Sequence, residues 1–382
     1  MKKILFVFAF LGVITALQAQ DEHEFWLDKG VVNQEFIYKT APYPECHAST
    51  IAETPEGLVA AWFGGTKERN PDVCIWVSRY EHGRWTEAQN VANGIMPDGE
   101  RYACWNPVLY QVPGGELWLF YKIGPNVAGW SGWWMKSQDN GRTWTKGEAL
   151  PEGFLGPIKN KPVMLNDGTI MCPSSREGSG GWRVIMEYTR DGGKTWQKTE
   201  QLNDGQEMAA IQPSIIFHKD GRLQVLCRSK NRAILETWSS DNGMTWSPMQ
   251  KSTLPNNNAG TDAVSLQDGR SLLVYNHVLP PGDLAKGPRT PLNVSVTKDG
   301  KTWYAAAVLE DSPISQYSYP SVIQTSDGLV HVVYTWRRQR IVHAVIDPAQ
   351  LKLKKIKGIA WPKAKRWDRP NLYKEAAEIT QD

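Results

Sequence analysis

The sequence predicts an all-β protein folded as a six-bladed β-propeller. One reason is a hairpin pattern that recurs six times along the chain, and another is a second turn motif that interleaves with it. A third is that the chain has no helical periodicity of useful length. We expect residues 20–382 to form one propeller domain, whose last strands near 341–346 close the ring against the segment before Tyr43.

Each copy of the hairpin pattern has a turn that ends in glycine, followed by a strand of alternating apolar residues. Such turns favour tight hairpins, because glycine accepts the positive φ that the turn needs. The glycines recur roughly every 50 residues, a period that fits the four strands of a propeller blade. They are Gly57, Gly115, Gly168, Gly221, Gly269 and Gly328.

The second motif has the form Ser/Thr-x-Asp-x-Gly-x-Thr-Trp. Full copies span residues 137–144, 189–196 and 239–246, a shortened copy spans 297–303, and a degenerate copy ends at Trp85. The Asp and Ser/Thr side chains can hydrogen-bond the turn backbone, while glycine takes the left-handed position. We interpret these Asp residues as structural and expect the Trp side chains to pack between neighbouring blades.

Polar residues recur at one end of the predicted hairpins. Antiparallel pairing brings the start of each first strand and the end of each second strand to the same mouth of the propeller. The first strands open at His47, Asn106, Lys161, Gln212, Asp262 and Tyr319, and the second strands end at Gly64, Lys122, Arg176, Arg228, His277 and Arg337. Converging polar groups in a concave site indicate a binding site. The alternative is that they only solvate a channel mouth, with Lys161 and Asp262 forming a structural pair.

The second motif resembles the Asp-box (BNR) repeat, and the residues at the mouth resemble the catalytic set of the sialidase (neuraminidase) superfamily. The resemblance implies an acid/base at Asp72 and a nucleophile at Tyr319. It also implies that Arg228 and Arg289 clamp a substrate carboxylate, for which the planar guanidinium is suited. The implied partner is an acidic oligosaccharide or polysaccharide that carries a sialic or uronic acid.

Two positions depart from the family pattern. His47 stands where the first arginine is expected, and Gln212 stands where a glutamate would activate the tyrosine. A neutral amide cannot take a proton from Tyr319. An unperturbed histidine titrates near pH ~6.5, so His47 is expected to be a titrating group rather than a permanent cation.

These departures favour elimination from a terminal acidic sugar by a lyase or dehydratase. An arginine would neutralise the carboxylate and acidify the adjacent C–H, with His47 and Tyr319 acting as the base and acid. The first alternative is a sialidase-like glycoside hydrolase with Asp72 as acid/base and Tyr319 as nucleophile. The second is a non-catalytic, glycan-binding propeller.

Several further residues are expected to contact substrate. Trp130 follows the second hairpin and supplies a flat apolar face for a sugar ring, whereas Trp133 and Trp134 begin a strand and are expected in the core. Gln212 opens its own strand at the same mouth and is also a candidate. The other candidates are Asn106, Lys161 and Arg69, the last of which lies beside Asp72.

Composition and the N-terminal segment limit where the protein is located and which kinds of partner it binds. Residues 1–19 have the basic start, apolar stretch and small-residue end of a signal peptide, which predicts export to the periplasm or the medium. That apolar stretch is too short for a membrane span. A net charge of +3 gives no electrostatic case for nucleic acid. The five cysteines lack metal-binding spacing, so neither a metal nor another cofactor is predicted.

Overall fold

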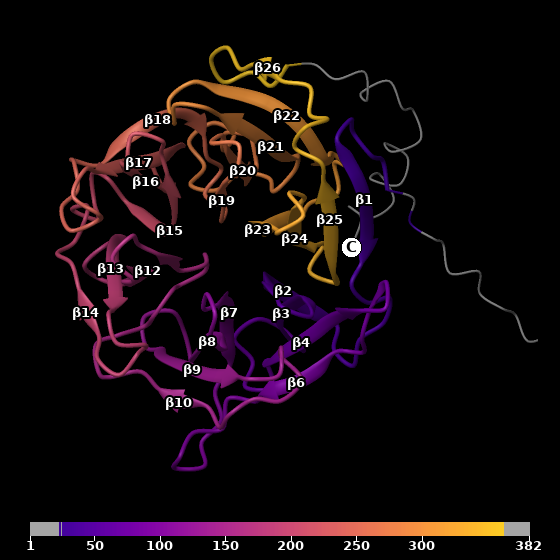
Figure 1. The fold of residues 1–382 in the computed structure, drawn as a ribbon, viewed down its shortest axis with the longest axis vertical. Helices are drawn as coiled ribbons and strands as arrows, with labels where there is room; N and C mark the ends of the chain where they lie inside the picture. The colour runs from indigo at the N-terminus through magenta and orange to yellow at the C-terminus, as the bar shows by residue number, and fades with distance from the viewer. Residues whose placement is uncertain (1–22, 24, 363–382) are drawn as a thin grey trace, which may run out of the picture.

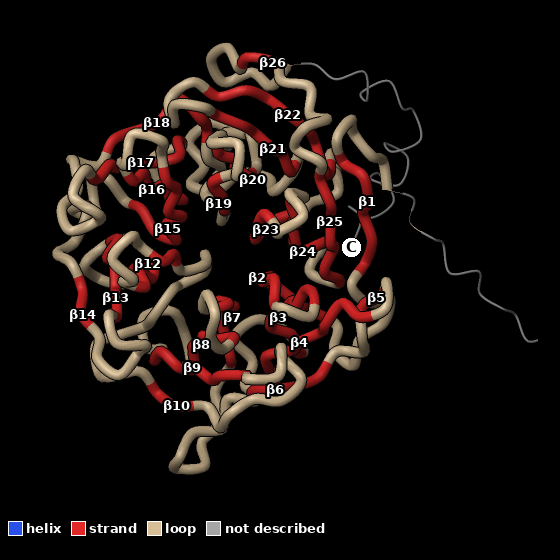
Figure 2. The backbone as a smooth tube through the Cα atoms, in the orientation of Figure 1, coloured by secondary structure: helices blue, strands red, loops and turns tan. Residues whose placement is uncertain are grey.

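The computed structural model describes residue 23 and residues 25–362, so the predicted signal segment lies outside the described residues. Within the described part, 26 strands and no helix are found (Figure 2). The strands form six sheets arranged as blades around a common axis, which confirms the predicted six-bladed β-propeller (Figure 1).

The first three blades follow one another along the chain, and in each the strands pair in chain order. Blade 1 contains β2 (Glu45–Thr54), β3 (Gly57–Gly65), β4 (Cys74–Glu81) and β5 (Arg84–Trp85), with β6 (Gln89–Ala92) also paired to β4. Blade 2 contains β7 (Cys104–Gln111), β8 (Leu117–Ile123), β9 (Ser131–Ser137) and β10 (Glu148–Ala149). Blade 3 contains β11 (Val163–Met164), β12 (Ile170–Arg176), β13 (Arg183–Thr189) and β14 (Gln197–Lys198).

The last three blades complete the ring. Blade 4 contains β15 (Ala210–Phe217), β16 (Leu223–Ser229), β17 (Ala233–Ser239) and β18 (Gln250–Pro255). Blade 5 contains β19 (Asp262–Ser265), β20 (Ser271–Tyr275), β21 (Leu292–Thr297), β22 (Trp303–Glu310) and the edge strand β26 (Lys354–Lys355). Blade 6 contains β23 (Tyr317–Gln324), β24 (Val330–Trp336), β25 (Arg340–Ile346) and β1 (Val31–Phe36).

Ring closure occurs in blade 6, where the two ends of the propeller meet. Strand β1 pairs antiparallel with β25, with Val31 opposite Ile346 and Phe36 opposite Val342. Figure 1 shows β1, near the indigo end of the colour scale, beside β25. The expectation that the last strands pair with the segment before Tyr43 is confirmed, and this pairing places blade 6 next to blade 1.

All six predicted hairpin turns are present. In five blades the predicted glycine lies between the first and second strands, and in blade 1 Gly57 is the first residue of β3. Five of the six glycines have a positive φ, the exception being Gly115 beside Gly114 at φ 68°. The pattern therefore located the β-hairpins correctly because a left-handed turn position selects glycine.

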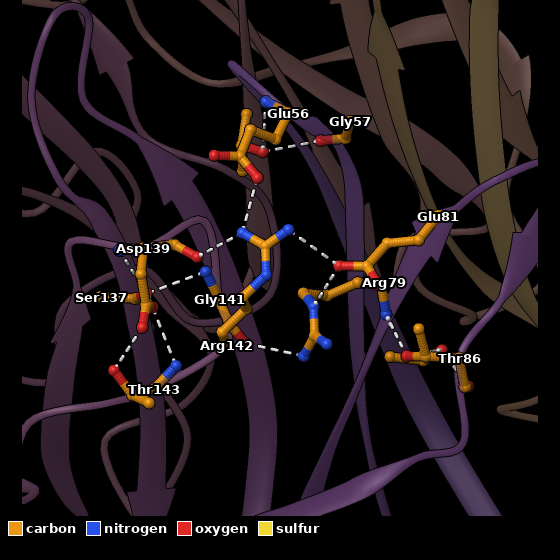
Figure 3. A network of polar contacts seen from close by, with 12 residues as sticks. Glu56, Gly57, Arg79, Glu81, Thr86, Ser137, Asp139, Gly141, Arg142 and Thr143 are labelled. Carbon is orange, nitrogen blue, oxygen red and sulfur yellow. Dashed lines mark hydrogen bonds and ion pairs between the residues drawn. The ribbon is translucent and has the colours of Figure 1, made fainter.

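The Asp-box turns are held together by their own side chains. Ser137 Oγ accepts a hydrogen bond from the Gly141 amide at 2.8 Å, and the Asp139 carboxylate accepts from the amide and hydroxyl of Thr143 at 2.8 and 2.5 Å (Figure 3). These bonds occupy the carboxylate inside the turn, so the structural interpretation of this Asp is supported.

Neighbouring blades also contact each other through these motifs. Arg142 Nη1 lies 2.6 Å from Glu56 Oε2, and Arg142 Nη2 lies 3.1 Å from Glu81 Oε1, which ties blade 2 to blade 1 (Figure 3). Such partly exposed pairs contribute about 0–1 kcal/mol each. The larger contribution comes from apolar packing, as where Trp196 of blade 3 meets Trp134 of blade 2 with 5.8 Å between ring centroids.

Candidate functional site

The site is built on a bulge that four of the first strands share. Pairing shifts register between His47 and Thr50, and the same kind of shift occurs at the equivalent place in β7, β15 and β23. A bulge bends the strand and re-aims a side chain, and it also accommodates a proline that cannot donate to the sheet. The left-handed residues at these bulges are Ala48 at φ 55°, Asn106 at φ 26°, Gln212 at φ 55° and Tyr319 at φ 55°.

A left-handed backbone is unusual for a side chain as bulky as tyrosine. Such residues persist only where the surrounding structure fixes them, and they cluster at functional sites. In β23 the strained residue is Tyr319 itself, while in β2 it is Ala48, directly after His47. The bulges of blades 1 and 6 therefore bring these two predicted site residues toward the axis.

The rings of His47 and Tyr319 are in contact. Their centroids lie 4.1 Å apart and their planes make an angle of 44°. His47 Nδ1 lies 2.9 Å from Thr335 Oγ1, while His47 Nε2 is buried and has no hydrogen-bond partner among the described residues. Thr335 can accept from Nδ1–H, which leaves the Nε2 lone pair free for a proton.

Burial changes the expected charge state of His47. The side chain is 2% exposed, and desolvation lowers its pKa well below the ordinary value. The positive charges of Arg338 and Arg289 act in the same direction. The expectation that this group titrates near its unperturbed value is therefore wrong, because the low dielectric and the cations both disfavour the imidazolium. His47 is a neutral imidazole at neutral pH.

The Tyr319 hydroxyl is held by blade 4. Arg228 Nη1 donates to Tyr319 Oη at 2.6 Å, and Gln212 Nε2 donates to the same oxygen at 3.1 Å. The orientation of the amide is fixed, since Arg228 can only donate and contacts Gln212 Oε1 at 3.3 Å. Tyr319 Oη therefore accepts two hydrogen bonds from blade 4.

Three cationic groups surround the Tyr319 ring. The Arg289 and Arg228 guanidinium carbons lie 5.4 and 5.8 Å from the ring centroid, and Lys159 Nζ lies 5.6 Å from it. Burial lowers the pKa of Arg289 to about 10, so this arginine is still charged at neutral pH. Two guanidinium groups close to one phenol form an arrangement suited to binding a carboxylate.

Sequence reasoning missed Lys159, which is 2% exposed and lies in the buried stretch 155–160 between blades 2 and 3. Its Nζ donates to the carbonyl oxygens of Pro320 at 2.6 Å and Thr261 at 3.1 Å, and so links three blades beneath the site. Burial lowers its pKa to about 7. The available signal was the polar run Lys159, Asn160 and Lys161 directly before Pro162.

Arg338 and Glu68 were also missed. Arg338 Nη1 lies 2.5 Å from Glu68 Oε2, which joins the loop after β24 to the loop after β3. Arg338 is the largest single charge acting on His47. No motif marks this arginine, because it lies in a tight turn after a strand end. It comes near His47 only because ring closure places blade 6 next to blade 1.

Asp72 and Arg69 lie in the loop after β3, and the structure does not join them to the central cluster. Asp72 accepts hydrogen bonds from the Thr66 amide at 2.9 Å and the Thr66 hydroxyl at 2.5 Å. Partial desolvation opposes the effect, but these hydrogen bonds hold the pKa of Asp72 below its ordinary value. Arg69 is exposed, with φ 84°. An ionised Asp72 is not ready to donate a proton.

The remaining predicted contacts lie around the same mouth. Asn106 is buried at its bulge, and Trp130 is half-buried with its ring 5.7 Å from that of Trp105. Lys161 Nζ lies 3.0 Å from Asp262 Oδ2, which is the structural pair named above as the alternative to substrate binding. This ion pair occupies Lys161, so the substrate-binding role predicted for it loses its main support.

The described residues contain no group of three or more His, Cys, Asp or Glu side chains placed to hold a metal ion. All five cysteines are buried and free. The described part of the chain also contains no helix long and apolar enough to cross a membrane.

The sequence comparisons identify the family. The family described as "BNR repeat-like domain" matches residues 56–332, so the chain belongs to this family of the sialidase superfamily. A sialidase from Micromonospora viridifaciens is 29% identical over 150 residues, which are 36% of this chain. The match spans only 22% of the length of that sialidase.

Solved structures agree on the fold. A protein of unknown function from Dyadobacter fermentans superimposes with a TM-score of 0.68 at 17% identity, covering 85% of this chain and 99% of its own. The intramolecular trans-sialidase from Ruminococcus gnavus gives 0.65 at 12% identity, with 85% and 99% covered. The NanB sialidase from Streptococcus pneumoniae gives 0.64 at 12% identity, with 83% and 71% covered. The shared architecture is the sialidase propeller.

Proposed function

We propose that this protein is an exported, glycan-degrading enzyme that cleaves an acidic glycan by elimination next to a uronate. The observation that carries the proposal is the contact between a neutral His47, whose Nε2 has no partner among the described residues, and Tyr319, whose hydroxyl is held by Arg228 and Gln212. One group is suited to accept a proton and the other to give one.

The arginines supply the electrostatic part of the reaction. Arg228 and Arg289 would hold the carboxylate of the sugar in a forked geometry and stabilise the negative charge that develops on it in the transition state. Both lie within 5.8 Å of the Tyr319 ring centre, so the clamp and the proton donor are close together.

The proposed elimination needs no reactant besides the substrate. His47 Nε2 takes the hydrogen from the carbon next to the carboxylate, the electron pair of that C–H bond forms a C=C bond, and the C–O bond one carbon further breaks. Tyr319 gives its phenolic proton to the departing oxygen. A uronate carries a hydrogen on the carbon next to its carboxylate, whereas a sialate carries none, so this chemistry selects a uronate.

Hydrolysis of the sialidase type is the second candidate, favoured by the sialidase that is 29% identical over 150 residues. Two contacts count against it. Gln212 offers Tyr319 an amide donor where a nucleophilic tyrosine needs a base, and Asp72 is held ionised by Thr66. A binding propeller without activity is the third candidate, and it would bind acidic glycans without any turnover.

The test is digestion of a panel of uronate-containing oligosaccharides, followed by absorbance of the unsaturated uronate. Wild-type protein is expected to produce this absorbance, and Tyr319→Phe and His47→Gln are expected to abolish it. A fluorogenic sialoside serves as the parallel substrate. Turnover of the sialoside, with no unsaturated product from any uronate glycan, would replace elimination by hydrolysis.

A further inference from the structure

A separate cavity opens between blades 2 and 3. Its volume is about 350 Å3, within the range of roughly 300–1,000 Å3 that ligand sites occupy. The loop from β8 to β9 forms one wall with Trp130, the connection between the blades forms a second with Phe154, and the end of β12 forms a third with Arg176 and Glu177. The strand ends that line the cavity are those of the His47 mouth.

The cavity combines an aromatic face with polar groups. Trp130 packs edge to face against Trp105 and is only half-buried, so part of its ring surface lines the cavity. Arg176 Nη2 binds Glu187 Oε1 at 3.0 Å and the Gly153 carbonyl at 2.6 Å, whereas Arg176 Nη1 is buried with no partner among the described residues. An unsatisfied buried donor is costly unless a ligand or water meets it.

Glu177 connects this cavity to the central cluster. Burial raises the pKa of its carboxyl, while the charges of Arg228 and Lys230 oppose that rise. The chain then turns, and Trp182 lies beneath Arg228, with 5.1 Å from the guanidinium carbon to the ring centroid. The loop 177–182 therefore has the cavity at one end and the carboxylate clamp at the other.

We propose that this cavity is a second sugar subsite, which takes a neutral pyranose linked to the uronate in the central site. The proposal rests on the proposed function. Trp130 would stack against the apolar face of the ring, Glu177 would accept hydrogen bonds from its hydroxyls, and Arg176 Nη1 would donate one. A second uronate would meet the Glu177 carboxylate, so charge selects a neutral sugar here. The enzyme would thus recognise an acidic–neutral disaccharide unit.

Binding tests this proposal without turnover. Saturation-transfer NMR with Tyr319→Phe protein and a panel of uncleaved uronate–neutral disaccharides is expected to give contacts on both rings. Adding Trp130→Ala or Glu177→Gln is expected to remove contacts on the neutral ring and to weaken binding roughly tenfold. Phe217→Ala and Glu87→Gln, which change exposed residues that do not line the cavity, are the matched controls.

Kinetics separates failure of the subsite from failure of the reaction. With wild-type protein as reference, Trp130→Ala is expected to lower kcat/KM on the disaccharide roughly tenfold, and on a 4-O-methyl uronate, which has the departing oxygen but no neutral ring, by less than about twofold. Equal loss on both substrates, or unchanged disaccharide binding in both cavity variants, would overturn the subsite even if elimination occurs. Disaccharide binding that depends on Trp130, with no elimination, would support the subsite and refute only the reaction.

Discussion

His47 and Tyr319 come from the first and the last blade, yet their rings lie 4.1 Å apart at the centre of the propeller mouth. Pairing of β1 with β25 closes the ring, and the bulges in β2 and β23 turn both side chains toward each other.

The activity should persist into acid conditions. Burial and the neighbouring arginines lower the pKa of His47, so the base stays unprotonated when the pH falls below about 6.5, the ordinary histidine value. The acid limb of kcat/KM should therefore lie well below that pH. Arg338→Gln removes the largest neighbouring charge and should move the limb toward neutral pH. A limb at about 6.5 in wild-type protein would contradict the assignment of His47 as the base.

Gln212→Glu should lower activity on uronates by about tenfold or more. A carboxylate at this position would pair with Arg228 and accept the Tyr319 hydrogen, so the proton donor and part of the clamp would be lost. The measurement is kcat/KM on a uronate oligosaccharide beside a fluorogenic sialoside. If Gln212→Glu instead gained sialoside hydrolysis and kept full uronate activity, Tyr319 would not be the donor.

Arg289→Met should abolish discrimination between a free carboxylate and its methyl ester. Wild-type protein should prefer the free acid, because a charged guanidinium close to Tyr319 binds a carboxylate more tightly than a neutral ester. The preference should fall by roughly 10- to 100-fold, mainly through KM. Lys230→Met, near the cluster but stacked on Trp182, is the comparison variant. An unchanged ratio in Arg289→Met would place the carboxylate elsewhere.

Asp72→Asn should change kcat by less than about threefold. The carboxylate is engaged by Thr66 and is held ionised, so elimination by His47 and Tyr319 does not need it. The sialidase alternative makes the opposite prediction, a loss of about 100-fold or more for a missing acid/base. Rates on the same uronate substrate, with melting temperature as a folding control, decide between them.

Stability should fall as the pH drops from about 6.5 to about 4, in part because of His277. Burial lowers its pKa to about 4, so the unfolded chain binds the proton first and stability is lost as the pH falls through this window. Below about pH 4, this effect of His277 is expected to have lowered the free energy of unfolding by about 3 kcal/mol. His277→Gln should therefore make the melting temperature depend less on pH, whereas His82→Gln, at an exposed position, should leave that dependence unchanged. Identical slopes in His277→Gln and wild type would refute this.

The sequence predicted the fold well because the residues that mark each turn act locally. Turn glycines such as Gly168 and Gly221 permit the positive φ that their turns require, and the side chains of an Asp box hydrogen-bond the backbone of their own turn. The pairing of Lys161 with Asp262 could be foreseen as an alternative because both residues open first strands. The alternation of apolar residues in the strands and the residues in the turns were enough to predict the number of blades.

The site was less predictable because it depends on contacts between distant segments. The low pKa of His47 arises from burial and from Arg338, which no spacing rule connects to it. Lys159 lies in an irregular buried stretch, where the polar run before Pro162 marks it but no periodicity shows which way it points. The bulges that aim Tyr319 and Gln212 become visible only as register shifts between paired strands. Predictions about which residues face the axis were therefore better than predictions about their charge.

The mass of the products from a defined uronate oligosaccharide tests the central claim most directly. If His47 removes a proton and Tyr319 protonates the departing oxygen, the two fragments together weigh the same as the substrate, and one of them carries the C=C bond. Fragments that together weigh one water more than the substrate would mean that the bond was hydrolysed, and the roles assigned to His47 and Tyr319 would be wrong.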